Sequence, residues 1–296
     1  MAEEIISLVK FCSVDSGLKI LNSQSLRWSA PHLFNDPFEP DYRSQADFTP
    51  EGLLRGIIKE AITMLFGARE PTGKSNRLVA AISRWREEER FTSEEEAESV
   101  LTQLLGQIAR QQQEHIDEYM KLWRQFTSSL RICCFCDKPT NMSAWQRYAD
   151  NHAGIALKFS AGEDSSLPAP MRVNYTTTPP LVTTLKEQIA VTYGRQAPPT
   201  PEDFIEKLLS KDRENKAERE WRCFAQEEGD PESDDQVWYS NKVFKAHELK
   251  AIYLGLGIKP EDRESIVHLA RQHFRNSRIF QARALPGRYE IDFDQL

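Results

Sequence analysis

Two glutamates and an arginine alternate in the stretch EREWR, near the end of a charged segment. Glu218, Glu220 and Arg222 lie two residues apart, and in a β-strand such residues point to one face of the sheet. A carboxylate on a strand can stabilise the positive charge that develops on a sugar ring when its glycosidic bond breaks. The alternative is a solvated strand face with a weak ion pair.

An aromatic pair forms the second group of candidates. Trp145 and Tyr148 lie three residues apart in a short predicted helix, 142–150, and therefore share a face of that helix. Such residues either fill a core or form the wall of a pocket, and filling a core is the commoner role. His152 follows the helix and is either the residue that ends it or a base.

A loop with three prolines, APHLFNDPFEP, carries Asn35, Asp36 and Glu39. Each proline pushes the residue before it toward extended backbone, so the loop is stiff without being regular. Loops that display polar groups on a rigid frame often carry function. Asn35 and Asp36 are also common turn residues, whose side chains bond their own backbone.

These residue types suit cleavage of the nicotinamide–ribose bond of NAD. The reaction passes through an oxocarbenium-like state, which a nearby carboxylate stabilises. We expect Glu220 to supply that carboxylate, with Glu218 as its neighbour. Trp145 and Tyr148 would stack on the nicotinamide.

Four further residues are expected to contact NAD. Lys10 supplies a basic group from the first predicted strand. Arg27 or Arg222 would hold the pyrophosphate, because arginine makes paired hydrogen bonds to phosphate oxygens. Asn35 is the polar group that the proline-rich loop would offer. NAD is expected as the substrate, with no other cofactor and no metal.

The composition limits the function. The net charge of −7 over 296 residues argues against a general electrostatic grip on nucleic acid, although a local basic patch is compatible with it. No apolar run approaches the roughly 20 residues of a membrane span, and the acidic N-terminus is no signal peptide. Three of the five cysteines, Cys133, Cys134 and Cys136, lie in an apolar predicted strand, so we expect reduced thiols in a cytoplasmic protein. The sequence has no Walker loop, dinucleotide fingerprint, nucleophile elbow or zinc signature.

The period of the apolar residues predicts an α+β protein with a mixed or antiparallel sheet. Strands are predicted at 5–12, 25–29, 130–136, 155–159, 171–177, 218–226, 251–255, 278–285 and 289–293, and residues 237–244 form a short aromatic stretch. Helices are predicted at 17–22, 53–65, 75–89, 93–126, 142–150, 181–193, 202–209 and 261–274.

Residues 50–128 differ from the rest because they are rich in Glu, Arg, Gln, Leu and Ala with helical periodicity. We interpret them as a helical insertion or lid within one main domain that covers 1–296. Its longest helix, 93–126, is either continuous or hinged near Gly106. The insertion is also where we expect a homodimer to form, if there is one.

Several stretches together resemble a family of bacterial proteins that is known as domain of unknown function number 2971. They are LVKF, ILNSQSLRWSAPHLFNDPFE, CFCDKPTNMSAWQRYADNHAGIALKF, EREWR and ELKAIYLGLGI. The resemblance spans nearly the whole chain outside 50–128. It implies no activity.

The opening of the chain is similar to that of ADP-ribosyltransferase-like folds, with a strand, a helix containing GLKIL, and a second strand that leads into a loop. This resemblance implies a split, mixed sheet that binds NAD in its cleft. Lys10 would be the first-strand residue, where that fold more often has Arg or His. Tyr148, with Trp145, would be the middle residue, and Glu218 or Glu220 the late glutamate. A toxin or phage-defence effector is the implied role.

Two rival functions stay open. One is a non-catalytic sensor or binding module, in which Asp36, Glu220 and Arg222 are buried structural partners with no cavity between them. The other is a metal-dependent nuclease, which would need Asp36, Glu39 and Glu218 within reach of one metal ion. The enzyme hypothesis requires Glu218 or Glu220 to face the same cleft as Tyr148 and Lys10.

Overall fold

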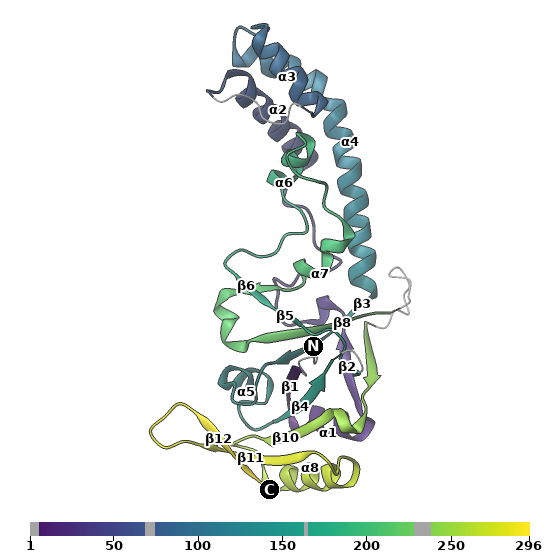
Figure 1. Cartoon of the computed structure of the whole chain (residues 1–296), viewed down its shortest axis with the longest axis vertical. Coiled ribbons are helices and arrows are strands. Elements are labelled where there is room, and N and C mark those ends of the chain that lie inside the picture. Colours follow the sequence, from purple (N-terminus) through teal and green to yellow (C-terminus); the bar gives the residue numbers. More distant parts are fainter. Residues whose placement is uncertain (1–5, 69–74, 163–164, 228–237) are drawn as a thin grey trace, which may run out of the picture. The chain divides into compact units, whose positions relative to one another are not determined.

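The computed structural model describes residues 6–68, 75–162, 165–227 and 238–296 (Figure 1). The chain forms two compact units. The first, which we call the sheet unit, comprises Met1–Glu39, Ser128–Pro179 and Leu209–Leu296. The second, the helical unit, comprises Pro40–Thr127 and Pro180–Leu208, so it takes in a segment beyond the insertion expected at 50–128.

The prediction of an α+β protein with a mixed, mostly antiparallel sheet is confirmed. Ten strands of the described chain form this sheet, and among the pairs on its main path only β10 and β11 are parallel. The strands are β1 (Ile6–Cys12), β2 (Ser25–Ser29), β3 (Leu130–Cys136), β4 (Ile155–Ala161), β5 (Met171–Arg172), β8 (Glu220–Gln226), β9 (Tyr239–Val243), β10 (Leu249–Leu254), β11 (Arg278–Ala284) and β12 (Ile291–Gln295).

The sheet is split between β1 and β2. Strand β3 pairs along its whole length with β8 on one edge. Its other edge is shared, because β1 pairs with it only at Val9↔Cys136 and β2 only at Ser29↔Ile132. Cys134 lies between these two points, so its backbone faces the gap between β1 and β2.

Helices cover both faces of the sheet. Alternate residues of a strand point to opposite faces, and the two core clusters follow that rule. One cluster contains Cys133 and Cys223 and is covered by α1 (Val14–Ser23) and α8 (Pro260–His273). The other contains Cys136 and is covered by α5 (Met142–Tyr148).

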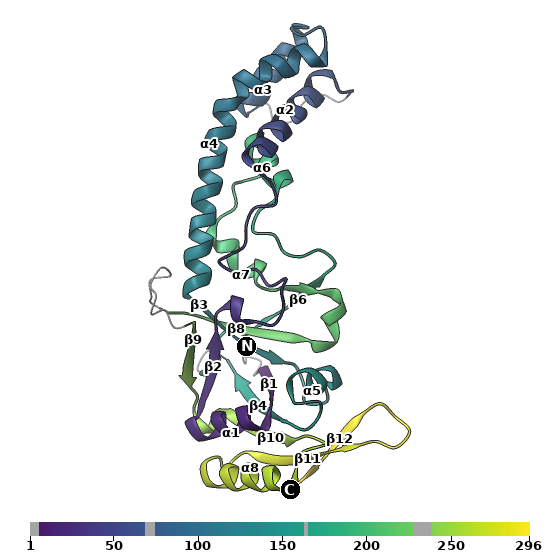
Figure 2. The ribbon, with the colours of Figure 1, turned by 180° about the vertical axis from the view of Figure 1, so that it is seen from behind.

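The helical unit is built around α4 (Glu94–Ser129), which is continuous through Gly106. Helices α2 (Pro50–Phe66), α3 (Arg77–Glu87) and α6 (Leu185–Thr192) gather beside it, as Figure 2 shows from the opposite side. The Tyr193 hydroxyl donates to the Ile57 carbonyl, and the Gln112 amide bonds Gln188. The unit is completed by η2 (Pro201–Asp203) and α7 (Phe204–Lys207).

One predicted strand, 171–177, is wrong in its extent because the chain changes partner within it. Val173 donates its N–H to the Glu220 carbonyl, and the next residue donates instead to the Leu209 carbonyl. The stretch therefore forms β5 in the main sheet and β6 (Asn174–Thr176), which pairs with β7 (Ser210–Asp212) in a separate two-stranded sheet. The remaining short helices of the sheet unit are η1 (Pro31–Leu33), η3 (Arg213–Glu218) and η4 (Ala246–Glu248).

All five cysteines are free, and all but Cys134 are buried. Among the described residues, no helix combines the length and the apolar character needed to cross a membrane. The predicted acidic N-terminus, residues 1–4, lies outside the described residues.

Candidate functional site

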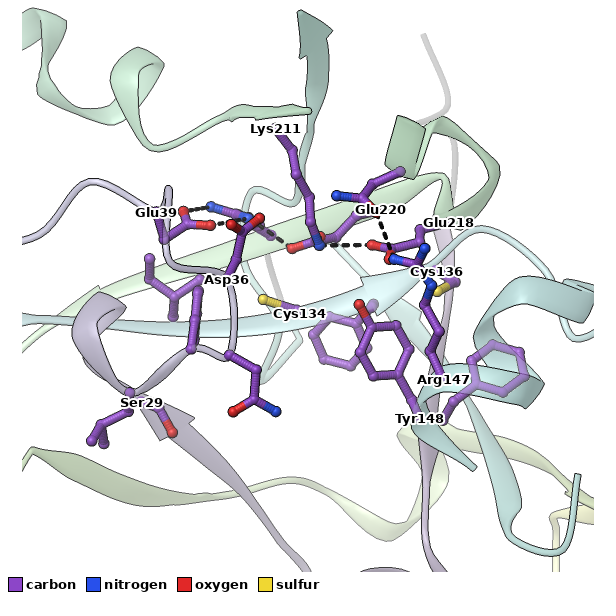
Figure 3. Close-up of a pocket in the computed structure, with 18 of the residues that line it drawn as sticks. Ser29, Asp36, Glu39, Cys134, Cys136, Arg147, Tyr148, Lys211, Glu218 and Glu220 are labelled. Atoms are coloured by element: carbon purple, nitrogen blue, oxygen red, sulfur yellow. Dashed lines mark hydrogen bonds and ion pairs between the residues drawn. The ribbon is translucent and has the colours of Figure 1, made fainter. Parts of the chain in front are cut away.

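A pocket of about 700 Å³ opens in the sheet unit where the sheet splits (Figure 3). Strands β1, β2 and β3 contribute Val9, Ser29 and Cys134 to its lining. The proline-rich loop, α5 and the segment from Lys211 to Glu220 complete the wall. A volume of this size suits a small organic ligand.

The pocket brings together seven of the eight residues that the sequence analysis selected for binding or catalysis. They are Lys10, Arg27, Asn35, Tyr148, Glu218, Glu220 and Arg222. The glutamates therefore line the same pocket as Tyr148 and Lys10, which is the arrangement that the enzyme hypothesis requires.

Lys10 occupies the split itself. Its ammonium group donates a hydrogen bond of 2.9 Å to the carbonyl of Cys134, between the points where β1 and β2 pair with β3. A buried carbonyl without a partner is costly, so Lys10 compensates for the missing strand neighbour. Lys10 is half-buried, and an ammonium group has three protons to donate.

Arg27 and Asn35 are exposed, as is Tyr148. The Arg27 guanidinium lies 4.0 Å from the centre of the Tyr239 ring, in a cation–π contact. In the described part of the chain, no salt bridge joins a carboxylate to Arg27 or to Lys10. We call Lys10, Arg27, Asn35 and Tyr148 the open wall of the pocket.

The two aromatic residues of α5 have different surroundings. Tyr148 lines the pocket and is 43% exposed, and its ring rises toward Lys211 and Glu218 (Figure 3). Trp145 is 1% exposed, packs edge-on against Phe11 at 5.2 Å and donates its indole N–H to the Pro139 carbonyl. Trp145 is therefore a core residue and is not among the pocket residues, so its ring offers no face for nicotinamide.

The paired glutamates are placed by a left-handed residue. The sequence analysis put Glu218 and Glu220 on one strand, but β8 begins at Glu220 and Glu218 ends η3. Arg219 between them has φ of 49°, which turns the chain so that both carboxylates reach one side. Asn141 caps α5 through Ala144 N–H and donates its amide to the Glu218 carbonyl at 2.8 Å, which fixes this turn against the helix.

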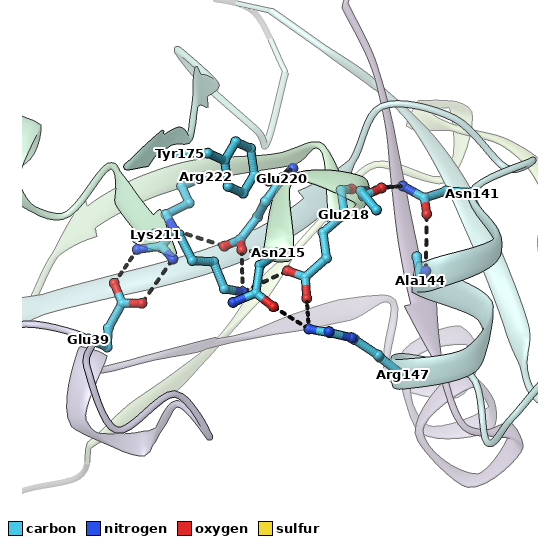
Figure 4. A network of polar contacts seen from close by, with 11 residues as sticks. Glu39, Asn141, Ala144, Arg147, Tyr175, Lys211, Asn215, Glu218, Glu220 and Arg222 are labelled. Carbon is cyan, nitrogen blue, oxygen red and sulfur yellow. Dashed lines mark hydrogen bonds and ion pairs between the residues drawn. The ribbon is translucent and has the colours of Figure 1, made fainter. Parts of the chain in front are cut away.

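The carboxylates belong to a chain of alternating charges (Figure 4). Glu218 accepts from Arg147 at 2.6 Å and from Lys211 at 2.7 Å. Lys211 also donates to Glu220 at 2.9 Å, and Glu220 accepts from Arg222 Nε at 2.8 Å. Arg222 then pairs through both terminal nitrogens with Glu39. We call these six residues the ion-paired wall: Glu39, Arg147, Lys211, Glu218, Glu220 and Arg222.

Burial makes these interactions strong. The side chains of Glu218 and Arg222 are each 1% exposed, and that of Glu220 is 7% exposed. Burial alone would raise the pKa of Glu220, but Arg222 and Lys211 outweigh it and lower the pKa to about 2. Burial raises the pKa of Tyr148; Lys211 opposes this, and Glu218 and Glu220 add to it. Glu220 is therefore a carboxylate and Tyr148 a neutral phenol at neutral pH.

The proline-rich loop contributes Glu39 to the ion-paired wall. The Asp36 carboxylate accepts from Phe38 N–H at 3.0 Å, so it stabilises the turn, as the simpler of the two interpretations held. That turn delivers Glu39 to Arg222, and the Phe34 ring packs 5.6 Å from the same guanidinium. In the ion-paired wall, Lys211, Glu220 and Arg222 lie between Glu39 and Glu218. Within the residues that the structure describes, no group of three acidic, histidine or cysteine side chains could hold a metal ion, so Asp36, Glu39 and Glu218 do not meet at one metal site.

His152 serves the backbone. It is the last of three consecutive residues with positive φ, after Asp150 and Asn151, and its carbonyl accepts from Gly257 N–H at 2.9 Å. A Cβ on Gly154 would lie 2.3 Å from the Cys12 carbonyl oxygen. This turn therefore joins α5 to the sheet through close backbone contacts, and the pocket lining does not include it.

Two residues of the ion-paired wall were missed by the sequence analysis as site residues. Neither Lys211, in a charged segment, nor Arg147, in the short helix expected at 142–150, is assigned a role from the sequence. The signal for Lys211 was its place in the run KDRENKAERE, where several cations precede the two glutamates, but the spacing does not indicate which cation meets them.

Comparison with models of known protein families, with curated proteins and with solved structures finds no match for the chain.

Proposed function

We propose that the sheet unit binds NAD in the split of its sheet and cleaves the nicotinamide–ribose bond, as an ADP-ribosyltransferase-like enzyme of the cytoplasm. The observation that carries the proposal is the pocket itself, which gathers Lys10, Tyr148 and Glu220 from three distant segments. The resemblance of the chain's opening to ADP-ribosyltransferase-like folds supports the same reading, since that resemblance implied a split sheet. A role as a toxin or phage-defence effector would follow from the same resemblance.

The chemistry assigned to each wall follows from its charges. The bond between ribose C1′ and the nicotinamide nitrogen breaks, and its electron pair leaves with nicotinamide. Water, or another acceptor, donates an electron pair to C1′ and releases a proton. Glu220, ionised at neutral pH, would stabilise the positive C1′ between these two steps.

The open wall would bind the rest of the substrate. The half-exposed Tyr148 ring can stack on nicotinamide, and Arg27 has no carboxylate partner among the described residues that competes with a pyrophosphate. Arg222 is a poorer candidate for that role than Arg27, because Glu39 and Glu220 already occupy its guanidinium.

The test is nicotinamide release from NAD, followed by chromatography, with thermal shifts in NAD, ADP-ribose and nicotinamide as the binding assay. Wild type should release nicotinamide and melt at a higher temperature with NAD. Tyr148→Ala should lose most of the shift, whereas Tyr289→Ala, a change at a fully exposed tyrosine away from the pocket, should keep it. Glu220→Gln should bind NAD and release no nicotinamide. Absence of both binding and release in folded wild type would contradict the proposal.

A non-catalytic binding module is the second candidate, and one observation favours it. Each of Glu39, Glu218 and Glu220 already pairs with a cation, so the ion-paired wall holds the fold whether or not a reaction occurs. This function predicts a thermal shift with a nucleotide, lost in Tyr148→Ala, without any nicotinamide release. The two assays therefore separate the candidates.

A further inference from the structure

Lys211 is the one cation of the ion-paired wall that contacts both members of the glutamate pair. Its ammonium lies 2.7 Å from Glu218 and 2.9 Å from Glu220 (Figure 4). It comes from β7, in the two-stranded sheet, and its side chain is 9% exposed. An ammonium held at both distances is shared, so each carboxylate depends on the same positive charge.

The other groups near the glutamates do not replace this charge. Arg147 and Arg222 bind the outer oxygens, one to each carboxylate, and neither contacts both. Of the other titratable groups that the structure describes around the pair, Tyr148 on α5, Tyr175 on β6, Cys134 and Cys136 on β3 and Glu39 on the proline-rich loop are neutral or acidic. The two other cations of the pocket lining, Lys10 and Arg27, contact the Cys134 carbonyl and the Tyr239 ring. Without Lys211, two buried carboxylates would face each other with no positive charge between them.

We propose that Lys211 is a positioning residue that holds Glu218 and Glu220 side by side as carboxylates and so presents Glu220 to the substrate. The presentation of Glu220 to the substrate rests on the proposed function, whereas the effect of Lys211 on the two carboxylates does not. Like charges at short range in a buried site cannot both persist, so removal of the ammonium makes the pair retain one proton near neutral pH.

The sign of the pH effect follows from that proton. In wild type Glu220 stays ionised from pH 5 to pH 8, because Arg222 and Lys211 outweigh its burial and lower its pKa to about 2, so it adds no pH dependence there. In Lys211→Met the folded glutamate pair binds one proton at a pH where the unfolded glutamates are ionised, so the pKa of the pair is higher in the folded state than in the unfolded state. A raised folded-state pKa stabilises the fold at low pH, and this stabilisation is lost as the pH rises. The melting temperature of Lys211→Met should therefore fall further below that of wild type as the pH increases.

The experiment measures melting temperatures of wild type and variants at pH 5, 6, 7 and 8. We expect the gap between wild type and Lys211→Met to widen by about 5 °C over this range. Lys242→Met is the matched control, because Lys242 pairs with the single carboxylate of Glu227 at 2.5 Å near the surface. Its gap to wild type should stay constant. A constant gap for Lys211→Met as well would overturn the proposal.

A double variant keeps the test decisive if Lys211→Met unfolds. Removing one carboxylate as well, in Lys211→Met with Glu218→Gln, relieves the repulsion, so the widening gap should disappear. If Lys211→Met is unfolded at pH 8, it should fold at pH 5, and the double variant should fold at both. A double variant that keeps the full pH dependence would contradict the proposal.

Nicotinamide release by the Lys211 variants separates this inference from the proposed function. Lys211→Met should release nicotinamide about 10-fold more slowly than wild type at pH 6, and the deficit should shrink as the pH rises and the proton leaves. Lys211→Arg, which keeps a cation, should restore the wild-type pH profile. If wild type releases no nicotinamide, the proposed function fails, while the melting temperatures still decide whether Lys211 keeps the two carboxylates ionised. A deficit in Lys211→Met that is the same at every pH would mean that Lys211 acts only on the fold.

Discussion

The two walls of the pocket differ in how their polar groups are satisfied. The ion-paired wall is a closed set, in which Glu218, Glu220 and Arg222 are nearly inaccessible to solvent and each has at least two charged contacts. The open wall has half-exposed or exposed side chains, and its two cations contact a carbonyl and an aromatic ring. The first arrangement holds a structure together, whereas the second leaves groups that a ligand can bind.

This difference matters for the interpretation of polar clusters in general. A cluster selected from sequence for its chemistry can be satisfied internally, and its loss then destabilises the fold before it affects any reaction. Here both kinds of group border one pocket, so stability and binding should respond to different substitutions.

The largest expected effect is on stability, from Arg222→Met. The substitution leaves Glu39 and Glu220 buried without the guanidinium that both contact, and breaking a buried pair in this way costs about 3–5 kcal/mol. Urea unfolding should show this loss. Arg283→Met, which breaks exposed pairs with Asp292 and Asp294, should cost less than about 1 kcal/mol. Equal losses for the two variants would mean that burial does not distinguish the ion-paired wall.

The second largest expected effect is the loss of stability in acid, through Glu220 of the ion-paired wall. The pKa of Glu220 is lowered to about 2, so its contribution is complete above the unfolded value and is lost as the pH falls from about 4.5 toward 2. The contribution is on the order of 3 kcal/mol. The difference in unfolding free energy between wild type and Glu220→Gln should therefore shrink as the pH falls from 6 to 3. A difference that is independent of pH would contradict the lowered pKa.

Local rules account for part of this site. The period of two along a strand correctly put Glu220 and Arg222 on one face and Trp221 and Cys223 on the other. The proline-rich loop does line the pocket, as its composition indicated. The α+β class followed from the same periodicities, because these depend only on residues close in sequence.

The parts that could not be predicted depend on contacts distant in sequence. Lys211 reaches the glutamates because β7 pairs with β6, which no local pattern specifies. Trp145 and Tyr148 were expected to act together, but residues three apart differ by about 60° around a helix axis. Helix α5 lies between the core and the pocket, so that angle is enough to put Trp145 in one and Tyr148 in the other.

On the open wall, Tyr148→Ala should separate binding from stability. Because the side chain is 43% exposed, its loss should change the unfolding free energy by less than about 1 kcal/mol. Loss of a stacking surface should weaken NAD binding by about 10-fold, as measured by calorimetry. A variant that unfolds as readily as Arg222→Met, or that binds NAD as wild type does, would remove the distinction between the walls.

The smallest expected effect is on affinity, from Arg27→Ala. Its guanidinium is exposed and contacts only the Tyr239 ring among the interactions described, so stability should hardly change. If Arg27 binds the pyrophosphate, affinity for NAD should fall a few-fold, and the salt dependence of binding should decrease because one screened charge contact is lost. Affinity for nicotinamide alone, which has no phosphate, should stay unchanged, and this ligand is the internal control. An equal loss for both ligands would show that Arg27 shapes the pocket and does not bind the phosphates.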